Sequence, residues 1–182
     1  MQKLNNELIS ADGCWNGMAT VKFFGAPAMT VGELPATGTK APDFVLAAQD
    51  LSDFDLQSLK GKRVVLNIFP SLDTDVCAAS VRRFNSDASK LPDTVVVCVS
   101  ADLPFAAKRF CVANGIENVM TGSTFRSAFG KKYGVEFAVG AFRGLMARSV
   151  VVIDRDGTVL GSQFVAEQSE EPDYAFVEKL LS

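Results

Sequence analysis

Histidine is missing from this chain of 182 residues. Its absence excludes zinc sites ligated by histidine and hydrolase sites that use imidazole as the general base. Any nucleophilic side chain must therefore be activated in another way, such as by a helix terminus or a nearby cation.

Cysteine is scarce, with four residues in the whole chain: Cys14, Cys77, Cys98 and Cys111. Four cysteines are too few for a disulfide-stabilised scaffold of this length, and their spacing is not that of metal ligands. Thiol chemistry is the possibility that they leave open.

Long apolar runs and blocks of one charge are also absent. No stretch approaches the roughly 20 apolar residues of a membrane span, and the start, MQKLNNELISADG, lacks the apolar core of a secretory signal. The 18 basic and 21 acidic residues give a net charge of -3 without a basic patch. We therefore expect a soluble, cytoplasmic protein that binds neither nucleic acid nor membranes.

The chain does contain strong signals for an α/β fold with a mixed sheet. Its 48% hydrophobic content suits one compact domain. Unbroken apolar runs predict buried strands at 63–69, 94–100 and 149–154, and helical patterns predict helices at 75–89, at 104–115 and after Pro172.

Weaker signals predict smaller elements around this core. A hairpin of 20–24 and 27–31 is expected to turn at Gly25 and Ala26. Phe44 to Leu46 suggest a further strand, and the pattern over 123–134 suggests a short helix. The RDG turn at 155–157 predicts that the strands on either side of it pair antiparallel. We expect residues 1–17 to form an N-terminal extension without fixed structure, ahead of one domain at 18–182.

The stretch PSLDTDVC (70–77) places a thiol where a strand turns into a helix. The first-turn amides and the helix dipole would favour the thiolate of Cys77. This matters because a free cysteine, with a pKa of about 8.5, is only ~3% ionised at neutral pH. From position alone, Cys77 is either a reactive thiol or inert packing.

The neighbours of Cys77 refine this interpretation. The Thr74 hydroxyl can cap the helix by accepting an amide hydrogen bond and can also donate to a sulfur or a bound oxygen, although a simple N-cap explains it as well. Asp73 and Asp75 would oppose the thiolate unless they point away or a cation offsets them. We therefore expect a cation near Cys77.

The spacing P-x-x-x-T-x-x-C, formed by Pro70, Thr74 and Cys77, resembles the peroxidatic-cysteine signature of the peroxiredoxin family. GTKAPDF, SADLPFAAKRFC, GLMARSVVVIDRDG and EPDY are similar to the thiol peroxidase branch, the atypical two-cysteine peroxiredoxins. The resemblance covers about residues 18–182. It implies a thioredoxin-like fold, with the N-terminal hairpin as an addition, and thiol-dependent reduction of hydrogen peroxide and organic hydroperoxides.

The resemblance also implies catalytic roles. Cys77 corresponds to the peroxidatic cysteine, Thr74 to the hydroxyl that binds peroxide and sulfur, and Pro70 to the ring that shields the pocket. Arg148 corresponds to the family's arginine, whereas an arginine ahead of a buried strand would otherwise be interpreted as a surface residue. Cys111 corresponds to the resolving cysteine, although a helical cysteine between Phe and Val is commonly packing.

The implied cycle oxidises Cys77 to a sulfenic acid, which Cys111 converts into an intramolecular disulfide that thioredoxin reduces. It needs no metal or organic cofactor. The family typically forms homodimers. Cys98, within the buried strand at 94–100, is expected to be part of the core.

Two other functions compete with this interpretation. A thioredoxin-type dithiol oxidoreductase would need a C-x-x-C pair, but Thr74 and Ser80 occupy the positions three residues either side of Cys77. A non-catalytic redox switch that uses the same disulfide remains the second hypothesis, because the sequence does not distinguish it from an enzyme.

Overall fold

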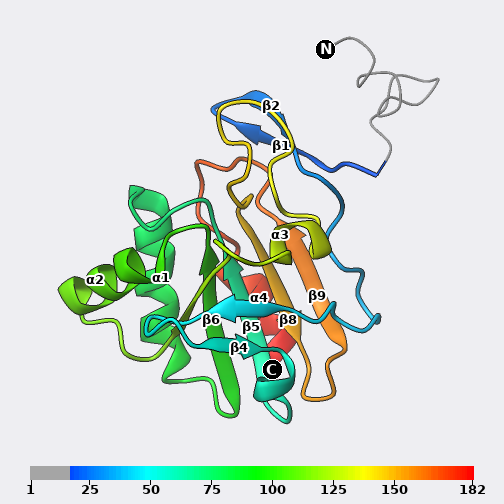
Figure 1. Ribbon diagram of the computed structural model, residues 1–182. Coiled ribbons are helices and arrows are strands. Elements are labelled where there is room, and N and C mark those ends of the chain that lie inside the picture. The colour runs from blue at the N-terminus through cyan, green and yellow to red at the C-terminus, as the bar shows by residue number, and fades with distance from the viewer. Residues whose placement is uncertain (1–16) are drawn as a thin grey trace.

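The computed structural model describes residues 17–182 and contains a mixed sheet of seven strands (Figure 1). The expectations for residues 1–16, including the thiol of Cys14, lie outside the described residues. The sheet order is β4-β3-β7-β6-β5-β8-β9. Its strands are β3 (Val45–Ala47), β4 (Asp53–Asp55), β5 (Arg63–Ile68), β6 (Thr94–Ser100), β7 (Met120–Ser123), β8 (Ser149–Ile153) and β9 (Val159–Phe164).

Helices cover the sheet on both faces. They are η1 (Gln57–Leu59), α1 (Asp75–Ala88), α2 (Pro104–Asn114), α3 (Phe129–Lys132) and α4 (Tyr174–Leu181). Helix α1 packs against β6, α2 against β7 and α4 against β8. In the part of the chain described here, no helix is both long and apolar enough to cross a membrane.

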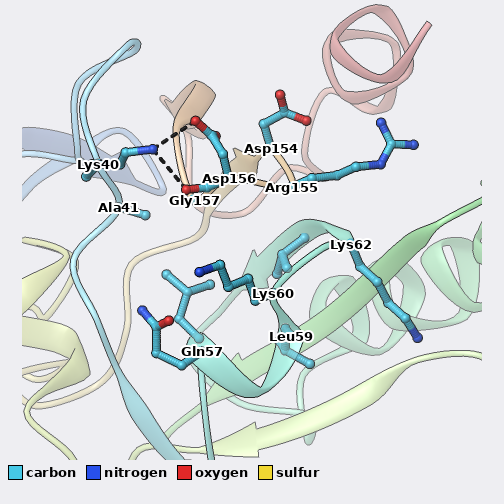
Figure 2. A pocket seen from close by; sticks show the side chains of 12 residues that line it. Lys40, Ala41, Gln57, Leu59, Lys60, Lys62, Asp154, Arg155, Asp156 and Gly157 are labelled. Carbon is cyan, nitrogen blue, oxygen red and sulfur yellow. Dashed lines mark hydrogen bonds and ion pairs between the residues drawn. The ribbon is translucent and has the colours of Figure 1, made fainter.

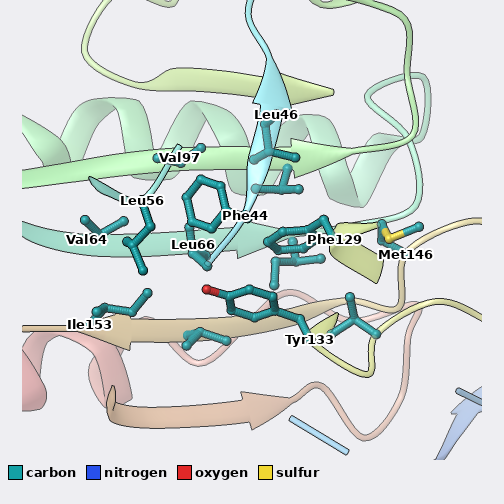
Figure 3. Packing of buried hydrophobic residues seen from close by; sticks show 14 of the residues in the cluster. Phe44, Leu46, Leu56, Val64, Leu66, Val97, Phe129, Tyr133, Met146 and Ile153 are labelled. Carbon is teal, nitrogen blue, oxygen red and sulfur yellow. The ribbon is translucent and has the colours of Figure 1, made fainter. Parts of the chain in front are cut away.

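The alternation of side chains along the strands divides the core into two layers. On one face Val64, Leu66 and Ile68 of β5 pack with Phe44 and with the rings of Phe129 and Tyr133, as Figure 3 shows in part. On the other face lie Val65 and the residues beneath α1, α2 and α4: Val96, Cys98, Val150, Val152, Phe84, Ala107 and Val177. The apolar runs at 63–69, 94–100 and 149–154 therefore form strands that are covered on both faces, as predicted, and they lie side by side in the sheet.

Strand directions determine where the functional side chains gather. Strands β5, β6 and β7 are parallel, and β8 pairs antiparallel with β5, with Ile68 opposite Ser149. The ends of β5 and β6 and the start of β8 therefore meet at the same edge of the sheet. The loop before α1, the loop before α2 and residue Arg148 come together there.

The N-terminal hairpin, β1 (Thr20–Phe23) and β2 (Ala26–Met29), forms a separate two-stranded sheet. Phe23 pairs with Ala26, so the turn is Phe24–Gly25, one residue earlier than predicted. Both turn residues have positive φ angles, 50° and 78°. Such angles suit a two-residue hairpin turn, and the sequence signal was weak because Phe24 rarely adopts one.

Other boundaries also differ from expectation. Strands β4 and β7 were not predicted, and the helix expected over 123–134 is the single turn α3. The helix after Pro172 begins two residues later, at Tyr174, where the Asp173 carboxylate accepts a hydrogen bond from the Phe176 amide. The remaining helices match their predicted ranges closely, and α2 ends at Gly115 in the left-handed conformation typical of a helix terminus.

Candidate active site

Cys77 lies in the first turn of α1 and is completely buried, with 0% of its surface exposed. Thr74 occupies the N-cap position in an extended conformation, and its carbonyl accepts the hydrogen bond from the Ala78 amide at 2.9 Å. The thiol is therefore at the positive end of a 14-residue helix, as the sequence predicts. The positive end of the helix dipole therefore lies beside the sulfur.

Arg148 supplies the cation that the sequence analysis required. Its guanidinium is buried, with the residue only 2% exposed, and Nη2 donates a hydrogen bond to Cys77 Sγ at 3.3 Å. Nε donates to the Gln168 carbonyl at 3.2 Å. Nη1 is buried without a hydrogen-bond partner among the described residues. One donor therefore holds the sulfur, and a second is available for an oxygen atom brought to it.

Thr74 differs from the expectation of a side-chain cap. Its hydroxyl donates to the Ser71 carbonyl at 3.2 Å, and no amide donates to it. The Thr74 amide also approaches the Ser71 carbonyl at 3.3 Å, so a tight turn occupies the hydroxyl locally. Asp73 and Asp75 are exposed to solvent. Within residues 17–182, the Thr74 hydroxyl at the helix start therefore bonds to Ser71 and forms no hydrogen bond with the sulfur.

The loop that carries Pro70 is fixed by a carboxylate that the sequence analysis did not identify. Asp102, which follows β6, accepts hydrogen bonds from the Ser71 hydroxyl at 2.7 Å, the Leu72 amide at 2.7 Å and the Ser100 hydroxyl at 2.8 Å. Pro70 is buried two residues after the end of β5. Asp102 thereby ties the approach to Cys77 to the end of β6.

Cys111 lies on α2 and is 5% exposed. It belongs to the same apolar cluster as Cys77, and both are free thiols. Burial raises the pKa of the Cys111 thiol, and a hydrogen bond from the Gln49 side chain partly opposes this effect. The structure thus brings the two sulfurs onto neighbouring helices under a shared apolar layer.

Gln49 is a second residue that the sequence analysis missed. Its amide also donates to the Thr121 hydroxyl at 3.0 Å, and it lines an open surface pocket of about 270 Å³ with Asp50 and Ser52. Gln49 therefore lines this pocket, and its hydrogen bond partly opposes the burial that raises the pKa of the Cys111 thiol. Only the three-dimensional structure could reveal this, because glutamine after a short strand carries no distinctive pattern.

Cys98 is part of the core, as predicted. It lies on β6 and is 2% exposed, and burial raises its pKa to about 12. The Asn67 side-chain amide approaches its sulfur at 3.7 Å. Such a thiol remains protonated and inaccessible near neutral pH.

A separate pocket of about 230 Å³ lies at the opposite end of β5 and β8 (Figure 2). Lys40 pairs there with Asp156 at 2.8 Å, and Lys60 and Gln57 line the cavity. No cysteine of the described residues lines this pocket, and Cys77 is not among its lining residues. Over residues 17–182, no group of three or more acidic, cysteine or histidine side chains forms a candidate metal site.

The chain is similar to a known protein family and to named relatives. The model of the Redoxin family matches residues 36–177. Over 157 residues the chain is 52% identical to proteins described as thiol peroxidase from Mycobacterium bovis and Mycobacterium tuberculosis, covering 86% of this chain and 94% of each relative.

Solved structures are also similar. A peroxiredoxin-like protein from Aquifex aeolicus matches with a TM-score of 0.85 and 40% identity, over 91% of this chain and 98% of that one. The thiol peroxidase from Chromobacterium violaceum has a TM-score of 0.83 and 23% identity, over 89% of this chain and 95% of that one, which supports the fold alone.

Proposed function

The chain belongs to the redoxin family as a thiol peroxidase of the peroxiredoxin type, and we propose that Cys77 is the sulfur that attacks the hydroperoxide. The observation that carries the proposal is the contact of 3.3 Å between the Arg148 guanidinium and Cys77 Sγ at a buried helix start. A permanent cation and the helix terminus together favour a negatively charged sulfur.

In the first step, the Cys77 thiolate donates an electron pair to the terminal peroxide oxygen while the O–O bond breaks. The sulfur is oxidised to a sulfenic acid, and the other oxygen leaves as hydroxide or alkoxide, which takes a proton and departs as water or an alcohol. Arg148 stabilises the developing charge through Nη2 and through Nη1, which has no partner among the residues that the structure describes. Pro70 limits the access of water, and Thr74 can turn its hydroxyl from Ser71 to the bound peroxide.

In the second step, the Cys111 thiol condenses with the Cys77 sulfenic acid, forming an intramolecular disulfide and releasing water. Both cysteines are buried on helices, so part of a helix must unwind before their sulfurs can bond. We expect α2 to do so, because it buries three residues whereas α1 buries five.

A dithiol protein, thioredoxin, then reduces the disulfide, and no metal or organic cofactor takes part. A reducing compartment such as the cytoplasm suits this cycle, because the two thiols must be regenerated after each turnover. We further propose a homodimer. The apolar surface around Phe24, which is 81% exposed, and Val139 supports this proposal, and sedimentation of the full chain tests it.

The function is tested with a peroxidase assay coupled to thioredoxin, comparing three cysteine variants. Cys77→Ser should consume no peroxide above background, and Cys111→Ser should consume one equivalent and then stop. Cys98→Ser, the matched control, should retain sustained turnover because its thiol is buried in β6. Sustained turnover by Cys77→Ser would refute the proposed attack, and oxidation of the natural chain without turnover would favour a redox switch.

A further inference from the structure

Gln168 is a completely buried polar residue between β9 and α4, with 0% of its surface exposed. A buried amide is costly unless its donor and acceptor groups form hydrogen bonds. Among the described residues, this side chain forms three hydrogen bonds, all with backbone groups, and two of them are with Arg148.

The contacts between the two residues are reciprocal. Gln168 Oε1 accepts a hydrogen bond from the Arg148 amide, and Gln168 Nε2 donates to the Arg148 carbonyl at 3.1 Å and to the Val165 carbonyl at 2.7 Å. In return, Arg148 Nε donates to the Gln168 carbonyl at 3.2 Å. The Gln168 side chain therefore holds the main chain of Arg148, and the Gln168 main-chain carbonyl holds the Arg148 guanidinium.

The guanidinium is planar, so fixing Nε also restricts the directions of its two terminal nitrogens. One of them, Nη2, reaches Cys77 Sγ at 3.3 Å, and Nη1 is buried without a hydrogen-bond partner within residues 17–182. A change in the position of Gln168 would therefore be transmitted to the hydrogen bond on the sulfur.

Gln168 itself is anchored by the N-terminal hairpin. The backbone amide of Gln168 donates to the Lys22 carbonyl at 2.7 Å, and the Lys22 backbone amide donates to the Ala166 carbonyl at 2.8 Å. The neighbouring Glu167 carboxylate accepts hydrogen bonds from the amides of Phe24 and Gly25, at 2.9 Å each. The segment that supports Arg148 is thus hydrogen-bonded to a two-stranded sheet outside the main sheet.

We propose that Gln168 is a positioning residue for peroxide reduction, acting through Arg148 to hold the guanidinium against Cys77. This proposal rests on the role assigned to Arg148 in the proposed function. The amide is suited to this position because it supplies one acceptor and two donors, whereas glutamate has no donor and methionine has neither.

The experiment measures the rate constant for oxidation of reduced Cys77 by hydrogen peroxide in Gln168→Met, Arg148→Gln and the double variant. A displaced guanidinium should slow Gln168→Met about ten- to a hundredfold, since a shift of about 1 Å can cost that much. The double variant should be no slower than Arg148→Gln alone. Gln163→Met, an exposed position on β9, is the matched control and should retain the natural rate.

The outcomes separate the two proposals. A natural rate in Arg148→Gln would refute the role of the arginine, whereas a slow Arg148→Gln with a natural rate in Gln168→Met would overturn the positioning proposal alone. Additive losses in the double variant would also overturn it, because they would mean that Gln168 acts independently of the arginine. If Gln168→Met does not fold, Gln168→Glu replaces it in the same cycle. This variant keeps the acceptor and the length but loses both donated bonds, so it should also be slow and non-additive.

Discussion

Replacing Asp102 should loosen the loop that leads to Cys77. Its carboxylate accepts three hydrogen bonds of 2.7 to 2.8 Å, from Ser71, Leu72 and Ser100. Asp102→Ala removes all three and leaves the Leu72 amide without its partner. Because this amide belongs to the turn before α1, the thiol at the helix start should lose its fixed position.

The magnitude follows from the number of bonds and their surroundings. A hydrogen bond to a charged group contributes about 1.5 to 3 kcal/mol when buried. Asp102 is only partly buried, so water replaces some of the loss, and we expect Asp102→Ala to reduce the free energy of unfolding by about 2 to 3 kcal/mol. For a chain of this length, that corresponds to a fall of about 5 to 10 °C in the unfolding temperature.

Urea and thermal unfolding measure the stability, and stopped-flow oxidation by hydrogen peroxide measures the effect on Cys77. Asp73→Asn is the control for stability, because Asp73 is an exposed aspartate in the same loop and should change the unfolding free energy by less than about 0.5 kcal/mol. If Asp102→Ala were as stable as this control, the three contacts would not hold the loop and the reasoning would be wrong.

Three further predictions follow from other parts of the structure. Hydrogen bonds from the Gly25 amide and from Ser169 lower the pKa of Glu167 from 4.5 to about 2, so its contribution to stability is complete above pH 4.5 and is lost as the pH falls toward 2. Glu167→Gln should therefore be less stable than the natural chain at neutral pH and equal to it near pH 2, and a deficit that persists at pH 2 in urea unfolding would contradict this. Because burial raises the pKa of Cys98 to about 12, iodoacetamide at pH 8 should label this thiol only after the protein is unfolded. Peptide mass spectrometry detects the label, and labelling of the native protein would be incompatible with the burial of Cys98. Gly134 and Gly144 both have positive φ angles, but a Cβ at Gly134 would lie 2.1 Å from the Glu33 carbonyl oxygen, whereas a Cβ at Gly144 would meet open space. Gly134→Ala should therefore lower the unfolding temperature more than Gly144→Ala does.

The sequence predicts the centre of the fold well, because strands buried on both faces carry unbroken apolar runs. It does not predict β4 and β7. The former, DFD, is short and polar, and the latter, MTGS, has no alternation of apolar and polar residues. Both strands form because neighbouring strands pair with them, which is a property of the tertiary structure.

The sequence predicts the reactive thiol of the candidate site but not the residues that hold it in place. The position of Cys77 at a helix start follows from local pattern, and the resemblance to peroxiredoxins directs attention to Arg148. Residue type alone favours an exposed arginine, since buried guanidinium groups are rare unless they are paired. The structure buries Arg148 by pairing it with Gln168 and the sulfur. Asp102 and Gln168 act through the packing of distant segments, which no local pattern encodes.

The local hydrogen-bond network explains the remaining difference at the site. Thr74 was expected to cap α1 with its hydroxyl, and it does occupy the N-cap position. The turn at 71–74, however, brings the Ser71 carbonyl within reach of that hydroxyl. A side chain with one donor satisfies the nearest acceptor, and sequence spacing alone does not indicate which acceptor that is.

The catalytic cycle requires a bond between two sulfurs that belong to free cysteines in this structure. Peptide mass spectrometry after addition of one equivalent of hydrogen peroxide to the reduced full-length chain tests it directly. The predicted product is an intramolecular disulfide between Cys77 and Cys111. A disulfide from Cys77 to Cys98 or Cys14, or a stable sulfenic acid on Cys77 with Cys111 still reduced, would contradict it.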